Sequence, residues 1–150
     1  MVDEFSTSNC LFITAKGNDV TLVVPKSDSI LASITTKSII GLAETVFKWK
    51  VEQRPVAFEE VVNGAFNECA AAGTAAIITP VKSISYKNEG SMQRLKIGDG
   101  ESAGPNFVKL MNYLTGLQSG DNEVRSSLAH LIKSNGFCRT RKDGYGHKAV

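Results

Sequence analysis

Two short apolar segments near the N-terminus, joined by a turn sequence, constrain the fold of this chain more than any other feature. Residues 10–15 (CLFITA) and 20–24 (VTLVV) are rich in residues that favour strands, and residues 16–19 (KGND) supply a turn between them. This pattern predicts a β-hairpin, in which the two strands run antiparallel. It therefore favours a fold with antiparallel pairs over a strict parallel array of βαβ units.

Helical and extended patterns alternate irregularly over the rest of the first 120 residues. Apolar residues between Ile39 and Phe47 recur with helical spacing, and Ser33 or Thr35 is the expected N-cap of that helix. Further helices are expected at residues 58–62, at residues 66–72 and from Pro105 onward. Further strands are expected at residues 49–56, 75–78, 83–86 and 93–97, with a turn at residues 80–81. This order favours a mixed α/β (α+β) fold with hairpins.

Composition sets the number and class of domains. The 150 residues are 42% hydrophobic and 21% charged, which fits one globular domain with a buried core and excludes a disordered or collagen-like chain. No run is apolar enough to span a bilayer, and the first residues do not resemble a signal peptide. We therefore expect an intracellular, cytoplasmic protein with no membrane partner.

Charge is unevenly distributed along the chain. Residues 1–120 carry 11 Lys and Arg against 12 Asp and Glu, whereas residues 121–150 carry 6 against 3. The basic cluster at residues 139–142 is short, and its flanking aromatic residues show no periodicity. We expect a solvated tail there, and no nucleic-acid partner.

The cysteines and histidines do not form a metal-binding pattern. Cys10, Cys69 and Cys138 are widely spaced without a CxxC pair, and His130 and His147 have no ligand partners in register. We expect free thiols in a reducing compartment and no bound metal.

Two places combine small residues and hydroxyl groups with the end of an expected element. At residues 33–36 (SITT), the free N–H groups of a helix N-terminus would bind an anion such as phosphate. At residues 73–76 (GTAA), the lack of side-chain bulk would let a ligand approach the main-chain amides. An ordinary helix cap and a tight helix-to-strand junction are the commoner explanations of these two patterns.

Several short motifs nevertheless occur in an order that is typical of one family. They are residues 4–9 (EFSTSN), 21–25 (TLVVP), 29–35 (SILASIT), 53–55 (QRP), 73–76 with 79–81 (GTAA and TPV), and 104–105 with 116–120 (GP and GLQSG). In this order the motifs resemble the class IV pyridoxal-phosphate aminotransferases, and most closely the branched-chain amino-acid aminotransferases of fungal type.

The resemblance implies a fold with defined boundaries. Residues 1–121 would form the large C-terminal domain of an N-terminally truncated fold-type-IV aminotransferase, which is a β pseudo-barrel with hairpins and surrounding helices. Residues 122–150 show no resemblance and are expected to be a divergent, poorly ordered basic tail. The parent family is homodimeric, and its full-length members imply a cytoplasmic or mitochondrial location.

The resemblance also implies a cofactor, pyridoxal 5'-phosphate, and the residues that bind it. Glu4 would pair with the pyridine nitrogen, because a negative partner keeps that nitrogen protonated and the ring electron-withdrawing. Ile34 and Thr35 would bind the cofactor phosphate through backbone and hydroxyl groups, in agreement with the anion site inferred from the helix terminus. Thr74 would also reach the phosphate.

The implied substrates are amino acids and 2-oxo acids. The amides of Thr74 and Ala75 would hold the substrate carboxylate, and Thr7 would lie on the substrate side of the ring. The implied reaction moves an amino group between leucine, isoleucine or valine and 2-oxoglutarate.

One departure from the family concerns the catalytic lysine. Transamination needs a lysine that holds the cofactor as a Schiff base and transfers a proton, and no lysine of this chain stands at a matching position. We therefore assign no catalytic residue and expect the chain to be inactive alone. A second departure is Thr36, which stands where the family has a basic residue.

Two alternatives remain open. The chain could be a non-catalytic remnant or decoy with residual cofactor binding, or it could belong with another class IV group, the D-amino-acid aminotransferases or the aminodeoxychorismate lyases. Residues 25–35 and 53–55 favour the branched-chain group.

Overall fold

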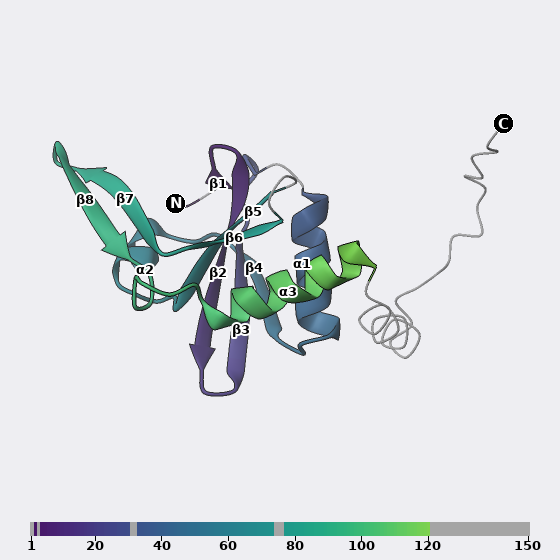
Figure 1. The fold of residues 1–150 in the computed structure, drawn as a ribbon. Helices are drawn as coiled ribbons and strands as arrows, with labels where there is room; N and C mark the ends of the chain where they lie inside the picture. The colour runs from purple at the N-terminus through teal and green to yellow at the C-terminus, as the bar shows by residue number, and fades with distance from the viewer. Residues whose placement is uncertain (1, 3, 31–32, 74–76, 121–150) are drawn as a thin grey trace.

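The computed structural model describes residue 2 and residues 4–30, 33–73 and 77–120, which form two sheets and three helices (Figure 1). The larger sheet has the spatial order β4-β3-β2-β5-β6, with β1 paired to β2. Its strands are β1 (Glu4–Phe5), β2 (Ser8–Lys16), β3 (Asp19–Pro25), β4 (Lys50–Arg54), β5 (Glu68–Ala72) and β6 (Ile78–Val81). Neighbouring strands are antiparallel except β3 and β4, which run parallel.

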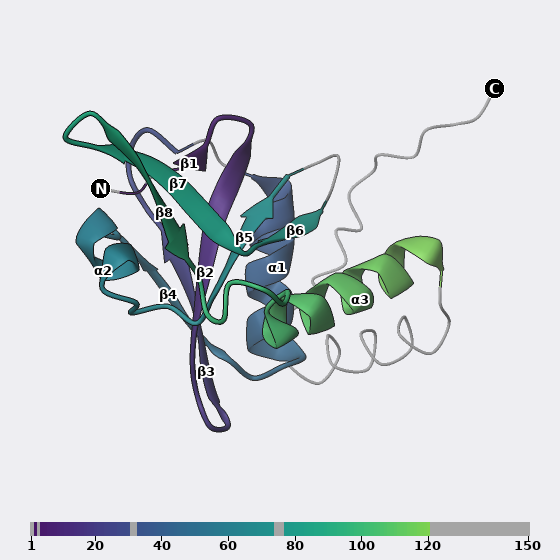
Figure 2. The same ribbon diagram turned by 60° about the vertical axis from the view of Figure 1, so that its left-hand side comes forward.

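The remaining elements cover the two faces of this sheet. Helix α1 (Ile34–Thr45) and helix α3 (Pro105–Ser119) lie on one face, whereas helix α2 (Phe58–Val62) and the hairpin of β7 (Ser83–Asn88) and β8 (Ser91–Lys96) lie on the other (Figure 2). Helix α1 connects β3 to β4, and such a crossover is what allows two successive strands to run parallel. None of the helices in the described part of the chain has the length and apolarity needed to cross a membrane.

Strand β2 is buried on both faces, because it has a hydrophobic cluster on each side. Leu11 and Ile13 pack with residues of α1 and α3, whereas Cys10 and Phe12 pack toward α2 and the β7–β8 hairpin. The Phe12 ring stacks on Phe66 with centroids 4.5 Å apart. A central strand between two covered faces shows a continuous apolar run rather than an alternating one, which explains the sequence of residues 10–13.

The mixed α/β fold class is confirmed, and so are the elements that have strong local signals. The predicted hairpin is β2–β3, with a turn at Gly17 whose φ of 60° suits glycine. Ser33 is the N-cap of α1, and its side chain accepts a hydrogen bond from the backbone N–H of Thr36. The helix predicted from Pro105 is α3, with Pro105 in its first turn.

The helix predicted at residues 66–72 is wrong, because this segment contains strand β5 (Glu68–Ala72). Its sequence ECAAA has good helix propensity, but the strand lies between β2 and β6, and its small side chains fit beneath the helices and the hairpin. The next strand begins later than expected, because β6 spans Ile78–Val81. The turn expected at residues 80–81 is therefore wrong: Pro80 lies within β6, which tolerates a proline because it is an edge strand. Residues 75–76 of the predicted strand lie outside the described residues.

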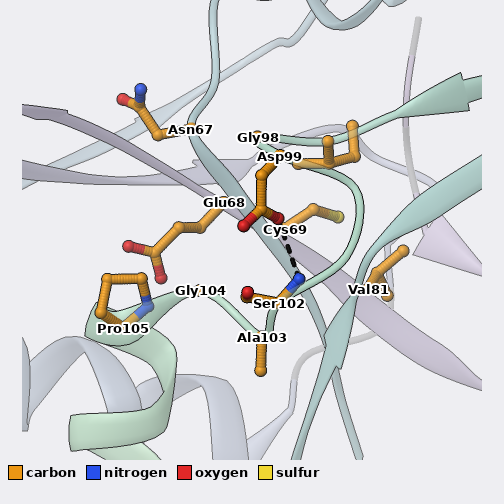
Figure 3. Close-up of a pocket in the computed structure, with 11 residues that line it drawn as sticks. Asn67, Glu68, Cys69, Val81, Gly98, Asp99, Ser102, Ala103, Gly104 and Pro105 are labelled. Atoms are coloured by element: carbon orange, nitrogen blue, oxygen red, sulfur yellow. Dashed lines mark hydrogen bonds between the residues drawn. The ribbon is translucent and has the colours of Figure 1, made fainter.

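Helix α3 begins on a buried carboxylate that comes from β5. The N-cap, Gly104, has no side chain, and the Glu68 carboxylate takes its place: it accepts hydrogen bonds from the backbone N–H of Asn106 and of Phe107. The Asn106 side-chain amide donates to Glu68 Oε1 at 2.6 Å. Figure 3 shows Glu68 beside Gly104 and Pro105. These residues line a small pocket of about 160 Å³. This contact fixes where α3 starts on the sheet.

Candidate functional site

A pocket of about 610 Å³ lies at one end of the larger sheet. The turn between β1 and β2, the N-terminus of α1 and the end of β5 meet there, at the upper end of the sheet in Figure 1. Its lining residues are Glu4, Phe5, Ser6, Thr7, Ser8, Asn9, Ser33, Ile34, Thr35, Ala72 and Gly73. The volume lies within the range of pockets that bind small molecules and cofactors.

The N-terminus of α1 supplies hydrogen-bond donors to this pocket. Ser33 has extended backbone geometry, and its Oγ accepts from the Thr36 N–H at 3.2 Å. The backbone N–H groups of Ile34 and Thr35 have no acceptor among the described residues, as expected for the first turn of a helix. With the helix dipole behind them, these two groups favour an anion in the pocket.

A carboxylate stands on another wall of the pocket. Strand β1 pairs with β2 so that Glu4 lies directly opposite Asn9, and Asn9 Nδ2 donates to Glu4 Oε2 at 3.0 Å. The other end of the Asn9 amide, Oδ1, accepts from the Thr36 hydroxyl at 2.9 Å. Asn9 is only 8% exposed. Its amide therefore forms a buried link between the Glu4 carboxylate and the first turn of α1.

The third wall is the end of β5. Pairing of β5 with β2 ends at Ala72 opposite Asn9, and a Cβ built on the following residue, Gly73, would contact Ser8 and the Thr7 carbonyl oxygen. The Gly73 N–H donates to the Ile77 carbonyl at 3.3 Å. This wall is therefore formed by backbone and small side chains, which leaves room for a ligand close to the main chain.

Four of the six residues predicted for the site line this one pocket: Glu4, Thr7, Ile34 and Thr35. The other two, Thr74 and Ala75, lie outside the described residues, although the preceding Gly73 lines the pocket.

Asn9 lies in the motif at residues 4–9, and Thr36 lies in the expected anion site at residues 33–36, but the sequence does not predict the hydrogen bond between them. This contact depends on how β2 packs against α1, and no local signal reveals that packing.

No lysine among the described residues lines this pocket. Lys26 and Lys37 line a neighbouring pocket of about 260 Å³, which shares Asn9 and Ser33 with the first pocket. Both lysines are exposed, as expected for solvated loop and helix residues. The described part of the chain therefore provides a carboxylate and anion-binding N–H groups, but no amine, to the candidate site.

Arg54, in the motif at residues 53–55, has a structural role. Its guanidinium forms two hydrogen bonds with the Glu60 carboxylate, at 3.0 and 2.8 Å, which tie β4 to α2. The hydrogen bond from Arg54, with a smaller contribution from the Ala57 N–H, lowers the pKa of Glu60, and the same pairing raises the pKa of Arg54. Arg54 does not line the candidate pocket.

Comparison with known proteins places these features in one family. The sequence pattern of the family described as "Amino-transferase class IV" matches residues 1–84. Aminotransferase atnJ of Emericella nidulans is 38% identical over 126 residues, which cover 81% of this chain and 35% of the relative. The branched-chain-amino-acid aminotransferase of Helicobacter pylori is 38% identical over 123 residues, which cover 82% of this chain and 33% of the relative.

A solved structure agrees with the sequence relatives. The branched-chain amino acid aminotransferase from Thermobaculum terrenum in its PLP form aligns with a TM-score of 0.60 and 29% identity, over 83% of this chain and 36% of that chain. The chain thus spans between 33% and 36% of the length of these relatives. Because the family pattern covers more than half of the 150 residues, the chain belongs to the class IV aminotransferases.

Proposed function

We propose that the pocket at the end of the larger sheet binds pyridoxal 5'-phosphate. The observation that carries this proposal is that a carboxylate, Glu4, and the free N–H groups of the α1 N-terminus lie on separate walls of one pocket of about 610 Å³. A pyridine nitrogen and a phosphate monoester are the two polar ends of this cofactor, and the two walls match them in charge. When bound, the cofactor supplies an electron sink for the α-carbon of an amino acid.

Each described residue has a distinct task in this proposal. The N–H groups of Ile34 and Thr35 bind the phosphate, and the Thr35 hydroxyl adds a hydrogen bond. Glu4 holds a proton at the pyridine nitrogen, because a nearby negative charge favours the protonated form. Thr7 lies at the turn between these groups and Gly73, where we place the substrate side of the site, together with Thr74 and Ala75.

The substrate class follows from the relatives. One is a branched-chain-amino-acid aminotransferase, and the aligned structure is another. We therefore propose that the site serves amino transfer between leucine, isoleucine or valine and 2-oxoglutarate, in a homodimeric enzyme. Transamination requires a lysine as proton carrier, and the described residues place none in the pocket. For this chain alone we accordingly propose cofactor binding without turnover.

A titration with pyridoxamine 5'-phosphate tests the proposal. This form has no aldehyde, so it does not react with exposed lysines, and its binding can be followed by equilibrium dialysis. We expect the full chain to bind it, and pyridoxamine without phosphate to bind at least about tenfold more weakly, because the charged hydrogen bonds at α1 are lost. We expect no turnover of leucine with 2-oxoglutarate.

Two variants make this titration specific. Thr35→Val removes the pocket hydroxyl and should weaken binding of the phosphorylated form but not of pyridoxamine. Thr45→Val makes the same change near the other end of α1, where the hydroxyl donates to the Gly41 carbonyl, and should leave binding unchanged. Equal affinity for the two ligands would refute the phosphate site, and an unaffected Thr35→Val variant would refute the role of the Thr35 hydroxyl.

A further inference from the structure

We propose that Asn9 and Thr36 are positioning residues that hold the Glu4 carboxylate in one orientation and thereby determine how firmly a proton is kept at the pyridine nitrogen of the bound cofactor. The proposal rests on the function proposed above and adds two residues to it. Its basis is the continuous hydrogen-bonded chain from Glu4 through Asn9 to Thr36 and Ser33.

The position of Glu4 explains why it needs such support. Its strand, β1, has only two residues, and Glu4 itself is exposed. An exposed glutamate on so short a strand can adopt several rotamers. Its direct cross-strand partner is Asn9, so both side chains leave the same face of the sheet, and the buried Asn9 amide fixes Glu4 Oε2. Oε1 accepts no hydrogen bond from the described residues and remains available to a ligand.

The hydrogen bonds of Asn9 with Glu4 and Thr36 show the direction of its amide. An ionised carboxylate can only accept, so the NH₂ group must face Glu4 and the carbonyl oxygen must face Thr36. The Thr36 hydroxyl donates to that oxygen and so stabilises the amide in the orientation that serves Glu4. Loss of the Thr36 hydroxyl would remove its hydrogen bond to the nearly buried Asn9 amide oxygen. The hydrogen bonds from Glu4 to Thr36 would then hold the carboxylate less firmly.

The hydrogen bonds from Glu4 through Asn9 to Thr36 connect the two polar walls of the pocket. Thr36 is in the first turn of α1, where its N–H donates to the Ser33 Oγ. The carboxylate is therefore tied to the helix turn that presents the free N–H groups of Ile34 and Thr35. A fixed separation between these walls suits a rigid ring with a charged group at each end.

The identity of residue 36 matters electrostatically. Among the described residues, no lysine or arginine forms an ion pair with Glu4. The neutral hydroxyl of Thr36 orients Asn9 without placing a positive charge near the Glu4 carboxylate. An opposite charge that is not compensated by a neighbour stabilises a protonated pyridine most strongly.

NMR of pyridoxamine 5'-phosphate labelled at the ring nitrogen tests this inference on the full chain. The chemical shift of that nitrogen reports its protonation, and a pH titration of the complex gives its pKa. For Thr36→Val we expect the pKa of the bound ring nitrogen to fall by about one pH unit, with a smaller loss of affinity than in Thr35→Val. Thr36→Ser, which restores a hydroxyl, should return the pKa to the native value.

The variants separate positioning from a general effect on folding. Thr36→Val keeps the backbone N–H that bonds to Ser33, so α1 keeps its cap. Thr45→Val makes the same substitution in the same helix, at a hydroxyl that donates to the Gly41 carbonyl. The ring nitrogen bound to this variant should have the same pKa as in the native complex. A Thr36→Val complex that titrates like the native one, or a Thr36→Ser complex that does not, would overturn the proposal.

A second measurement distinguishes this proposal from the proposed function. In the cofactor-free chain, the side-chain amide protons of Asn9 should exchange slowly with water, and Thr36→Val should accelerate their exchange. Native binding of the cofactor combined with unchanged Asn9 exchange in Thr36→Val would reject the positioning role alone. Failure of the native chain to bind the cofactor, with Asn9 still protected, would reject the proposed function and the link to the ring nitrogen together.

Discussion

The carboxylate of Glu68 accepts a hydrogen bond from the backbone N–H of Phe107 at 3.0 Å, although 39 residues separate the two along the chain. Strand β5 thus supplies the N-terminal cap that the sequence of α3 lacks, since Gly104 has no side chain. Phe107 is fully buried in the cluster beneath α1 and α3. The cap consequently couples the start of α3 to the packing of the sheet.

The close approach of Glu68 to Gly104 leads to a first prediction. A Cβ built on Gly104 would collide with the Glu68 carboxylate, so Gly104→Ala must displace that carboxylate. The φ of Gly104 is −59°, which alanine adopts freely, so the effect is steric. We expect a loss of about 1–3 kcal/mol in the free energy of unfolding, measured by urea denaturation. Gly41→Ala is the matched control: it meets open space within α1 and should stabilise by about 0.5–1 kcal/mol.

The Arg54–Glu60 pair predicts a pH dependence of stability. The pKa of Glu60 lies below the ordinary value of a glutamate, chiefly because of the hydrogen bond from Arg54. A lowered pKa means that the stabilisation is complete above the unfolded pKa and is lost as pH falls through the folded pKa. Glu60→Gln should therefore lower the urea midpoint at pH 7, and the difference from the native chain should shrink at about pH 3.

The neighbouring Glu59 provides the control for this titration. It lies in the same short helix and forms no ion pair among the described residues. Glu59→Gln should therefore leave the pH dependence unchanged. A difference between Glu60→Gln and the native chain that grows toward acid pH would contradict the assigned sign.

The Tyr113 hydroxyl leads to a third prediction. It is buried and has no hydrogen-bond partner within the described residues, and burial raises its pKa. The ring packs edge-on against Phe47, with centroids 5.8 Å apart, a contact that phenylalanine would keep. Tyr113→Phe should leave the free energy of unfolding unchanged or raise it by up to about 1 kcal/mol. Tyr86→Phe loses a hydrogen bond to Gln93 and should give no gain in the free energy of unfolding. A lower free energy of unfolding in Tyr113→Phe would contradict the prediction, because it would mean that the Tyr113 hydroxyl forms a stabilising hydrogen bond.

A fourth prediction concerns Glu4 itself. Glu4→Gln keeps the size of the side chain but removes the charge, so the bound ring nitrogen of pyridoxamine 5'-phosphate should lose its proton at a lower pH than in the native complex. The same nitrogen NMR titration measures this shift. Glu44→Gln, an exposed residue of α1 outside the pocket, should have no effect. An unchanged titration in Glu4→Gln would place another group beside the ring nitrogen.

Elements with strong local signals could be predicted from the sequence, whereas elements set by tertiary contacts could not. The β2–β3 hairpin and the Ser33 cap depend on residues close together in the chain. The alanine-rich sequence of strand β5 predicts a helix, because alanine favours helices wherever packing does not decide otherwise. The Asn9–Thr36 hydrogen bond spans 27 residues, and it depends on the crossover that places α1 against β2. Motif order singled out four residues that line one pocket, Glu4, Thr7, Ile34 and Thr35, but it could not reveal the hydrogen bonds that Asn9 forms with Glu4 and Thr36.

The pocket described above is built from the ends of elements rather than from their interiors. Its lining comes from β1, the β1–β2 turn, the first turn of α1 and the last residues of β5, and it meets the hydrophobic clusters only at Ala72 and Phe5. Substitutions at lining positions outside the clusters, such as Thr7 and Thr35, can therefore alter what is bound without repacking either core. A chain of this design can exchange one ligand specificity for another during evolution while its scaffold stays the same.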